Sequence, residues 1–487
     1  MITFVVSLTI LIGGYFIYGA VLERVFGVDP KKLTPVQRLK DGVDYVEIPL
    51  WRIFLIQFLN IAGLGPIFGA IAGALWGPVA FLWIVFGCIF GGMVHDYLSG
   101  MLSIRHDGKS IPEIVGKYMG VGVKQFMRGF TVILMIVVGA VFVKGPASIL
   151  NDISGGVMHI NFWIATVFIY YILATLLPID KLIGRIYPVF GFALLFMAVG
   201  ITAGIIAEGY AMPELTAASF ANLHGTPDKF PIFPMMFVSI ACGAISGFHS
   251  TQSPLMARCL KNEKYGKRIF AGAMAAEGVV ALIWAAAAMA FFGGVEGLNK
   301  EMTAHGDNAA WAVNIISNTL LGKFGAILAL LGVVAAPITS GDTAFRSARL
   351  IVADFLHYDQ KPIKNRLFIT APLFIVGFIL VQANFGIIWR YMAWSNQTLA
   401  TIVFWTITIY LVQEKKFYWV TLLPGVFMTA VCTSYILVAP EGFKLPVAIG
   451  NITGVIIAAA SFVIFMIWKL RLSSKKQPVT VEVHTDK

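Results

Sequence analysis

Charged side chains are scarce in this sequence. Asp, Glu, Lys and Arg make up 13% of the 487 residues, whereas hydrophobic residues make up 58%. A soluble domain carries about a quarter charged residues and is roughly half apolar. The shortage of charge therefore excludes a soluble globular protein and predicts an all-α polytopic membrane protein whose surroundings are a lipid bilayer.

Cysteines and catalytic motifs are also few. The four cysteines, Cys88, Cys242, Cys259 and Cys432, form no CxxC or Cys/His ligand spacing. This argues against disulfides and a structural zinc site. HExxH, GxSxG and Walker A motifs are absent, and no soluble segment is large enough to hydrolyse ATP. We therefore expect no enzymatic activity, no cofactor and no primary active transport by this chain alone.

Apolar runs are what the sequence has in abundance. A helical crossing needs about 20 apolar residues, and we count thirteen such runs, the first of them a retained helix and not a cleaved signal peptide. They cover roughly 2–22, 51–76, 79–103, 126–144, 160–178, 187–207, 233–257, 269–293, 318–340, 367–384, 387–412, 417–438 and 447–468. Residues 303–318 and 342–357 are expected to form amphipathic helices outside the membrane, on opposite sides.

The basic residues predict the orientation. The net charge of +11 is spread over short loops between apolar runs, so it does not indicate a nucleic-acid partner. The loops after odd-numbered spans lie on the same side of the membrane as the C-terminal tail, and together they contain all but six of the 36 Lys and Arg. The six on the other side are Lys144, Lys229, Lys300, Lys323, Arg390 and Lys444. Because cytoplasmic loops carry the excess of Lys and Arg, we expect an external N-terminus and a cytoplasmic C-terminus.

Two of the apolar runs are interrupted by glycine, proline and polar residues. The first contains QFLNIAGLGPIFG at 57–69 and the second SIACGAISGFHSTQSP at 239–254. They fall in spans 2 and 7, so spans 2–6 and 7–11 form two blocks of five. Because five is an odd number, the second block crosses the membrane in the opposite orientation to the first. Paired broken helices in inverted repeats indicate the substrate site of a secondary transporter. The alternatives are a proline kink in span 2 and a polar helix end in span 7.

The two blocks of five spans also divide the chain into segments. We expect a peripheral first helix and cytoplasmic loop at 1–50, and a first repeat with an external loop at 51–230. A second repeat is expected at 231–412, two additional spans at 413–472 and a disordered cytoplasmic tail at 473–487.

The polar residues of the two interruptions are the candidate substrate-binding residues: Gln57, Asn60, Gly63, Gly65, Ser246, Gly247, His249 and Ser250. Ionisable residues inside spans are functional candidates by default, and Glu277, Asp96 and Asp342 could carry a coupled proton. Their alternatives are helix caps or salt bridges, for Asp342 to Arg346 one turn later. Thr339 and Ser340, beside carbonyls freed by Pro337, offer oxygen ligands for a small cation, or bonds back to their own helix.

Five motifs between residue 57 and about residue 400 resemble the carbon starvation protein A (CstA) family. They are NIAGLGPIFG, HDYLSGMLSIRHDGKSIPEIVGKYMG, ISGFHSTQSP, TSGDTAFRSARLIVAD and WSNQTLA. The resemblance implies a transporter of the bacterial inner membrane that takes up peptides, or pyruvate with protons, during nutrient limitation. The family is similar to the amino acid–polyamine–organocation superfamily, which implies the same five-plus-five (LeuT-like) inverted repeat.

The resemblance also implies a sodium-like site. In sodium-coupled members of that fold an Ala-x-x-Thr-Ser pattern faces the first broken helix, and Ala336, Thr339 and Ser340 match it, with Ile61 as the expected carbonyl partner. The sequence leaves open peptide or pyruvate as substrate, proton or sodium as coupling ion, and the oligomeric state. The alternative function is a metabolite-binding sensor or a channel without coupled transport; an intramembrane enzyme has only His95, Asp96 and His249 in its favour.

Overall fold

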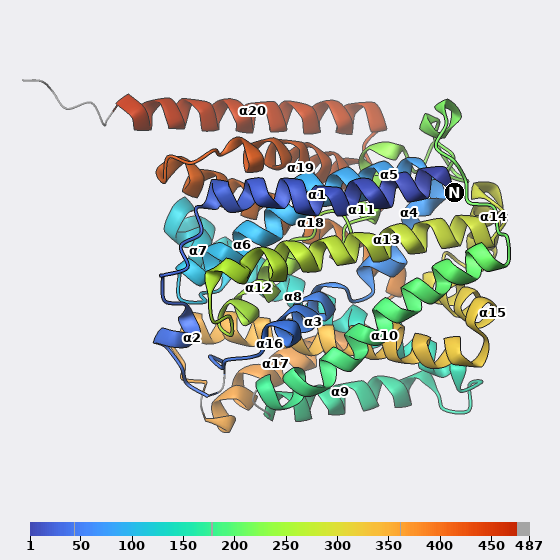
Figure 1. The fold of residues 1–487 in the computed structure, drawn as a ribbon, viewed down its shortest axis with the longest axis horizontal. Coiled ribbons are helices and arrows are strands. Elements are labelled where there is room, and N and C mark those ends of the chain that lie inside the picture. The colour runs from blue at the N-terminus through green and yellow to red at the C-terminus, as the bar shows by residue number, and fades with distance from the viewer. Residues whose placement is uncertain (43, 177–178, 361, 475–487) are drawn as a thin grey trace, which may run out of the picture.

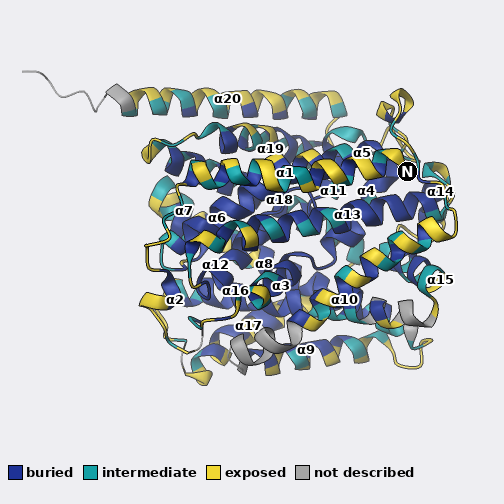
Figure 2. Ribbon diagram, viewed as in Figure 1, coloured by how far each residue is buried: buried dark blue, intermediate teal, exposed yellow. Residues whose placement is uncertain are grey.

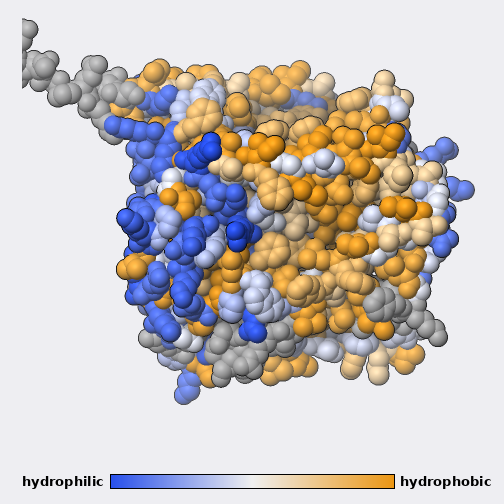
Figure 3. Space-filling model, viewed as in Figure 1, coloured by the Kyte–Doolittle hydropathy of each residue, from blue (hydrophilic) through white to orange (hydrophobic). Residues whose placement is uncertain are grey.

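In the computed structural model, which describes residues 1–42, 44–176, 179–360 and 362–474, every regular element is helical. Figure 1 shows the long helices lying roughly along one direction, stacked in several layers. A hydrophobic band covers the middle of the face seen in Figure 3, and its largest hydrophilic area lies at the end where α2 and α7 are found. This is the surface expected of a bundle that crosses a bilayer.

The first half of the bundle begins with a long helix and contains the first interruption. Its elements are α1 (Ile2–Phe26), α2 (Pro35–Arg38), α3 (Leu50–Ile61), η1 (Gly65–Gly69), α4 (Ala70–Gly73), η2 (Ala74–Trp76), α5 (Val79–Leu82), η3 (Trp83–Gly92), α6 (Met93–Arg105), α7 (Ile111–Met119), α8 (Val121–Ile153), α9 (Ile160–Leu176) and α10 (Ile179–Ala207).

The second half contains the second interruption and ends in three long helices. Its elements are η4 (Ala217–Phe220), η5 (Ile232–Met236), α11 (Phe237–Ser239), α12 (Gly247–Ala257), η6 (Glu263–Tyr265), η7 (Lys267–Ala271), α13 (Gly272–Phe291), α14 (Val295–Ala304), α15 (Ala309–Ala329), η8 (Leu330–Ala335), α16 (Ala336–Leu356), α17 (Ile363–Val381), α18 (Phe385–Gln413), α19 (Trp419–Val438) and α20 (Val447–Ser474).

Burial separates central helices from peripheral ones, as Figure 2 shows. In the spans 79–105 and 263–291, which contain α6 and α13, 83% of the most apolar stretch is buried, whereas the values for α1 and α20 are 22% and 17%. Lipid tails solvate an apolar helix as well as protein does, so the outer helices can keep large aliphatic side chains at the surface. The small side chains of α13, among them 285–288, suit its central place.

The count of thirteen spans is not confirmed. Among the described residues, eight helices are long and apolar enough to cross a membrane, or nine if the bent pair 50–61 and 65–76 is one span. The second broken helix is too short on either side of its break to be counted. The predicted disordered tail lies, from residue 475 onward, outside the described residues.

Both predicted interruptions are confirmed. The first broken helix stops at Ile61, resumes at Gly65 and bends by 53°. The second stops at Ser239 and resumes at Gly247, so that residues 240–246 are not helical. Gly243 has a φ of +92°, a conformation that favours glycine.

The two broken helices touch each other along a stripe of glycines. A Cβ atom added to Gly65 would lie 2.2 Å from Cβ of Cys242, and one added to Gly73 would lie 2.1 Å from Cγ1 of Ile240. Gly69, between them on the same face, lies directly against the carbonyl oxygen of Ser239. The resumed half of span 2 can therefore lie directly on the opened backbone of span 7 because it has no side chains there.

One predicted boundary is wrong. We expected span 9 to end near residue 340 and 342–357 to form a separate amphipathic helix outside the membrane. Instead α16 runs without interruption from Ala336 to Leu356, and most of its polar side chains are buried. Its Thr, Ser and Arg side chains face other helices of the bundle and not water, which hydropathy along the chain cannot reveal. The other expected amphipathic segment, 303–318, is divided between α14 and α15.

The contact between the breaks gives the first prediction. Gly65→Ala should lower the free energy of unfolding by about 1–3 kcal/mol, the usual cost of overpacking a tight contact. Because the new methyl group would meet only the side chain of Cys242 at close range, Cys242→Gly should restore part of the loss. Unfolding of the purified protein in detergent measures both.

The matched control is Gly13→Ala, because a Cβ added to Gly13 meets nothing within 4 Å. Equal stability of Gly65→Ala and Gly13→Ala, or no interaction between the Gly65 and Cys242 changes, would contradict the proposed contact between the two broken helices.

Candidate functional site

A side chain from a distant helix holds the start of α12, the resumed half of span 7. Oδ1 of Asn396, on α18, accepts from the backbone N–H of Phe248 at 2.5 Å, and its amide lies within 3.2 Å of the hydroxyl of Ser246. It acts as an N-cap supplied from outside the helix. Sequence reasoning included Asn396 in a family motif but gave it no role; the only signal was an amide within an apolar span.

Gly247 and Ser250 complete this helix start. A Cβ added to Gly247 would lie 2.4 Å from the backbone nitrogen of Ala400, so α12 meets α18 backbone to backbone. The hydroxyl of Ser250 donates to the carbonyl of Gly247 at 2.7 Å. Three of the predicted substrate residues, Ser246, Gly247 and Ser250, thus have contacts that hold the second break in shape.

Asp96, in the first turn of α6, lies between two histidines. Its Oδ1 is 2.8 Å from Nδ1 of His95, and its Oδ2 is 2.8 Å from Nδ1 of His249 on α12. All three side chains are completely buried. An ionised carboxylate only accepts hydrogen bonds, so with Asp96 ionised each Nδ1 carries a proton and donates a hydrogen bond to it. This fixes the orientation of both rings.

Glu277, on α13, faces the other nitrogen of His249. Nε2 of His249 lies 3.2 Å from Oε2 of Glu277, at ion-pair distance but without the alignment of a hydrogen bond. Since Nδ1 already carries a proton, Nε2 and the carboxylate are both acceptors unless a further proton is bound to one of them. We call Asp96, His249 and Glu277 the central triad; all three side chains are completely buried, and a proton between Nε2 and Glu277 would let these two groups hydrogen-bond.

Cys242 adds a thiol to this group. The possible ligand atoms of Cys242, His249 and Glu277 lie within 4.8 Å of one another, and among the described residues they form the one such group that could hold a metal ion. Thiolate, imidazole and carboxylate are ligands for a transition ion. The spacing of cysteines in the sequence could not reveal this set, because Glu277 comes from another helix. All four cysteines are buried free thiols.

Gln57 and Asn60 lie in the last turns of α3, before the first break. Both are completely buried, and neither the oxygen nor the nitrogen of either amide has a hydrogen-bond partner. Burying an amide without partners costs roughly 1–3 kcal/mol in proteins. Two such amides, three residues apart on one helix, form an arrangement that a polar ligand would stabilise.

The oxygen atoms near the first break belong to a second small cluster. The hydroxyl of Ser340, on α16, donates to the carbonyl of Leu59 at 2.8 Å and lies 3.1 Å from the carbonyl of Ala336; Thr339 also donates to Ala336. The carbonyl that Ser340 contacts is thus two residues before Ile61, the expected partner. Gly63 lies beside Ser340. All of the possible ligand atoms in this cluster are oxygens, which suits a hard cation such as Na⁺.

Asp342 does not join the central triad. It is buried on α16, two residues after Ser340. Arg346, its suggested partner, donates from Nη2 to the carbonyl of Ala174 on α9. Of the three predicted proton carriers, the structure thus brings Asp96 and Glu277 together around His249, and leaves Asp342 near the oxygen cluster.

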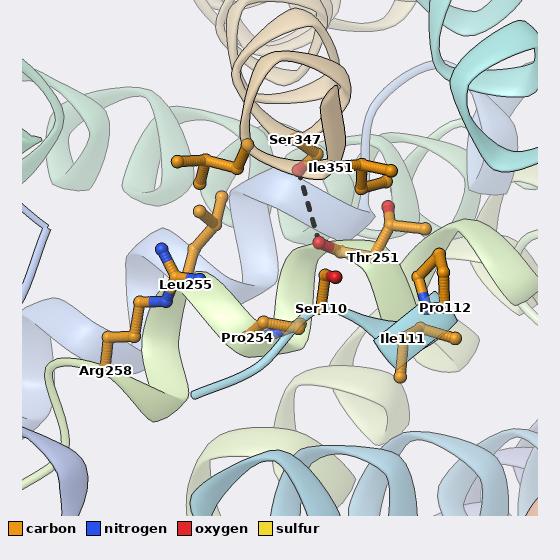
Figure 4. A pocket seen from close by; sticks show the side chains of 10 residues that line it. Ser110, Ile111, Pro112, Thr251, Pro254, Leu255, Arg258, Ser347 and Ile351 are labelled. Carbon is orange, nitrogen blue, oxygen red and sulfur yellow. Dashed lines mark hydrogen bonds between the residues drawn. The ribbon is translucent and has the colours of Figure 1, made fainter. Parts of the chain in front are cut away.

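The site is closed to solvent. The predicted substrate-binding and proton-carrying residues are all buried. A shallow pocket does open between α12, α16 and the start of α7, where Ser347 donates to the carbonyl of Thr251 (Figure 4). None of the predicted site residues lines it. The pocket therefore gives no access to the two breaks.

Comparisons with known proteins agree with this architecture. The family model described as "Carbon starvation protein CstA" matches residues 1–166 and 157–323. An uncharacterised membrane protein of Haemophilus influenzae is 44% identical over 351 residues, which cover 62% of this chain and 95% of that protein. A protein of Bacillus subtilis named peptide transporter CstA is 25% identical over 525 residues, which cover 87% of this chain and 88% of its own.

A protein of Escherichia coli named pyruvate/proton symporter BtsT is 25% identical over 339 residues, covering 57% of this chain and 47% of that protein. Among solved structures, a manganese transporter of Eremococcus coleocola superposes with a TM-score of 0.54 at 13% identity, over 89% of this chain and 99% of that one. MhsT in complex with L-phenylalanine gives 0.52 at 14% identity, over 85% and 97%. These likenesses show the LeuT-like fold with its five-plus-five inverted repeat.

Proposed function

The chain belongs to the carbon starvation protein CstA family and is a multi-pass membrane transporter, not an enzyme; we propose that it imports small carboxylate-bearing nutrients, short peptides or pyruvate, by symport with a proton. The printed names of its relatives, peptide transporter and pyruvate/proton symporter, support these two substrates.

The observation that carries the proposal is the contact between two proton acceptors in the central triad. Nε2 of His249 and the carboxylate of Glu277 need one proton between them, and both are closed off from water. His249 lies on α12, the half-helix that begins at the second break, whereas Glu277 lies on an unbroken helix. Movement of α12 would separate the two groups, open the site to water and let the proton leave. A buried acid–base pair on a movable half-helix couples proton binding to conformation.

The substrate is proposed to bind between the two breaks, next to Gln57 and Asn60. The amide nitrogens can donate to a carboxylate, and the amide oxygens can accept from N–H groups. A peptide offers both kinds of partner, whereas pyruvate has only acceptors. The two unpartnered amide oxygens therefore favour a peptide over pyruvate. The start of the resumed helix at Gly65 adds a partial positive charge suited to a carboxylate.

The oxygen cluster of Thr339, Ser340, Ala336 and Leu59 supports sodium as the second candidate for the coupling ion. Its hydroxyls and carbonyls come from α16 and from the first broken helix. A cation there would hold these two helices together and would influence the shape of the substrate site. One result would identify sodium and not the proton as the coupling ion. Uptake would be driven by a sodium gradient at constant pH, and it would be lost in Ser340→Ala.

Proton coupling predicts the behaviour of Glu277→Gln in proteoliposomes. With a clamped membrane potential, an inward gradient of one pH unit can drive about tenfold accumulation at one proton per substrate. We expect the wild-type protein to approach this value and Glu277→Gln to reach only equilibration, because the amide cannot exchange a proton. Counterflow of preloaded substrate should persist in the variant, since it needs no net proton movement.

Glu296→Gln, an exposed position on α14, is the matched control and should accumulate substrate like the wild type. Full accumulation by Glu277→Gln would exclude the central triad as the proton carrier. Uptake by the wild type that ignores every imposed gradient would exclude symport and leave a channel or sensor.

Substrate recognition predicts an unusual effect of Asn60→Leu. The substitution removes a buried amide without partners and keeps a similar volume, so the melting temperature of the substrate-free protein should stay level or rise. The rise in melting temperature that a dipeptide gives the wild type should be lost. Thermal unfolding with dipeptides, amino acids and pyruvate, each added separately, makes the measurement.

Asn161→Leu changes an exposed asparagine in the first turn of α9 and should respond to dipeptides like the wild type. A full dipeptide response in Asn60→Leu would place the substrate elsewhere, and a response to pyruvate alone would reverse the preference for peptides.

We further propose the inner membrane as the location, with the N-terminus outside and the C-terminus in the cytoplasm. A membrane-impermeant maleimide should then label Lys261→Cys only in inverted vesicles, and Lys300→Cys only in whole spheroplasts; both positions are exposed. The four native cysteines are buried and give little background. Labelling of Lys261→Cys from the outside would reverse the orientation.

A further inference from the structure

Three arginines outside the central triad are buried, and each has at least one guanidinium nitrogen without a hydrogen-bond partner. The exposed fractions are 4% for Arg346, 1% for Arg349 and 5% for Arg366. All three guanidinium nitrogens of Arg349 lack a hydrogen-bond partner, as do Nε and Nη1 of Arg346 and Nε of Arg366. We call these residues the arginine cluster. None of them was a candidate in the sequence, where each resembles an ordinary loop or helix-end charge.

Hydrogen bonds to α9 hold two of the three side chains, those of Arg346 and Arg366. Nη2 of Arg346 donates to the carbonyl of Ala174 at 3.2 Å, and Nη1 of Arg366 donates to the next carbonyl, that of Thr175, at 3.3 Å. Arg349 follows Arg346 by one helical turn on α16 and interacts electrostatically with both other arginines. The neighbouring face of α16, with Ser347, packs instead against α12 (Figure 4).

Two acidic groups among the described residues interact with the arginine cluster, Asp44 and Asp342. Asp44 interacts electrostatically with Arg349 and Arg366, but its Oδ1 has no hydrogen-bond partner. Asp342, one turn before Arg346, interacts electrostatically with Arg349. Among the residues that the structure describes, none of the three arginines takes part in a salt bridge. Among the described residues, the three arginines thus outnumber the two acidic groups that interact with them.

A buried guanidinium without an anionic partner is strongly unfavourable, far more so than a buried pair. The planar fork of an arginine matches the oxygens of a carboxylate or phosphate in a bidentate manner. We propose that the arginine cluster binds an oxyanion, a phosphate or a carboxylate, which accepts hydrogen bonds from the free nitrogens of Arg349 and Arg346. The anion would hold α16, α17 and the end of α9 together.

Two sources can supply this chemistry. The anion can be free in solution, or it can be the phosphate of a lipid headgroup. The second source has structural support, because the helices beside the cluster carry exposed apolar side chains of the kind that lipid covers, Ile172 and Leu173 on α9 and Leu367 and Phe368 on α17. The inference is independent of the proposed transport function, since it concerns binding at residues outside the central triad.

The experiment measures the melting temperature of the full chain with two sources of oxyanion. One arm adds inorganic phosphate to protein in uncharged detergent. Its reference is sodium chloride at the same ionic strength. The other compares nanodiscs of phosphatidylcholine alone with nanodiscs containing phosphatidylglycerol. We expect at least one source to raise the melting temperature of the wild type. In Arg349→Gln the apparent affinity should fall roughly tenfold or more, the loss expected for a charge-assisted hydrogen-bond donor.

Arg24→Gln is the matched control, because Arg24 is exposed at the end of α1 and its loss changes the net charge equally. Arg349→Lys keeps the charge but loses the fork and should bind with intermediate affinity. In buffer without oxyanions Arg349→Met should melt at the same temperature as the wild type or higher, since it removes an uncompensated charge.

A response to phosphatidylglycerol alone identifies the lipid headgroup, and a response to inorganic phosphate alone identifies a free anion; both support the site. Equal responses of Arg349→Gln and Arg24→Gln in both arms would overturn the proposal. So would a large loss of stability in Arg349→Met that no oxyanion influences, because Arg349 would then be held by the protein itself.

Discussion

The opened backbone between Ser239 and Gly247 is the constraint on which the rest of the structure depends. Inside a bilayer no water satisfies free peptide groups, so non-helical backbone must be enclosed by protein. Here the enclosure is built from several sides. Trp83 donates its indole N–H to the carbonyl of Ile240, Asn396 caps the start of α12, and glycines of span 2 allow direct contact. The polar interior of the bundle follows from this enclosure.

Two buried charge clusters lie on helices next to this opening, and each is incomplete in a different way. In the central triad two acceptors face each other without a proton between them, because His249 is bonded through Nδ1 to Asp96 and faces Glu277 with Nε2. The arginine cluster has more donors than acceptors. Charges that lack partners in a low-dielectric interior are expensive. This cost is why we propose that each cluster binds something mobile, a proton in one and an oxyanion in the other.

Much of this could be predicted from particular residues. The glycines and proline of 57–69 and the polar run of 239–254 marked both breaks, and a lone carboxylate in an apolar stretch marked Glu277. The sequence predicts His249 as a substrate-binding residue and Asp96 as one of three candidate proton carriers, of which Glu277 is the clearest. Asp96 and His249 are 153 residues apart in the chain, and no local pattern reports such a contact. The same limit hid the capping role of Asn396 and misplaced the end of span 9 at residue 340.

The sequence by itself determined the class of the protein, the broken helices and the inverted repeat, because these depend on composition, on glycine and proline, and on the parity of apolar runs. Each is a property of local sequence or of its order along the chain. Only the tertiary structure decided which polar groups share a site, which nitrogen of His249 faces Glu277, and that the guanidinium of Arg349 is buried without a hydrogen-bond partner. Those are properties of distances between helices, and packing sets them through side chains that lie far apart in the sequence.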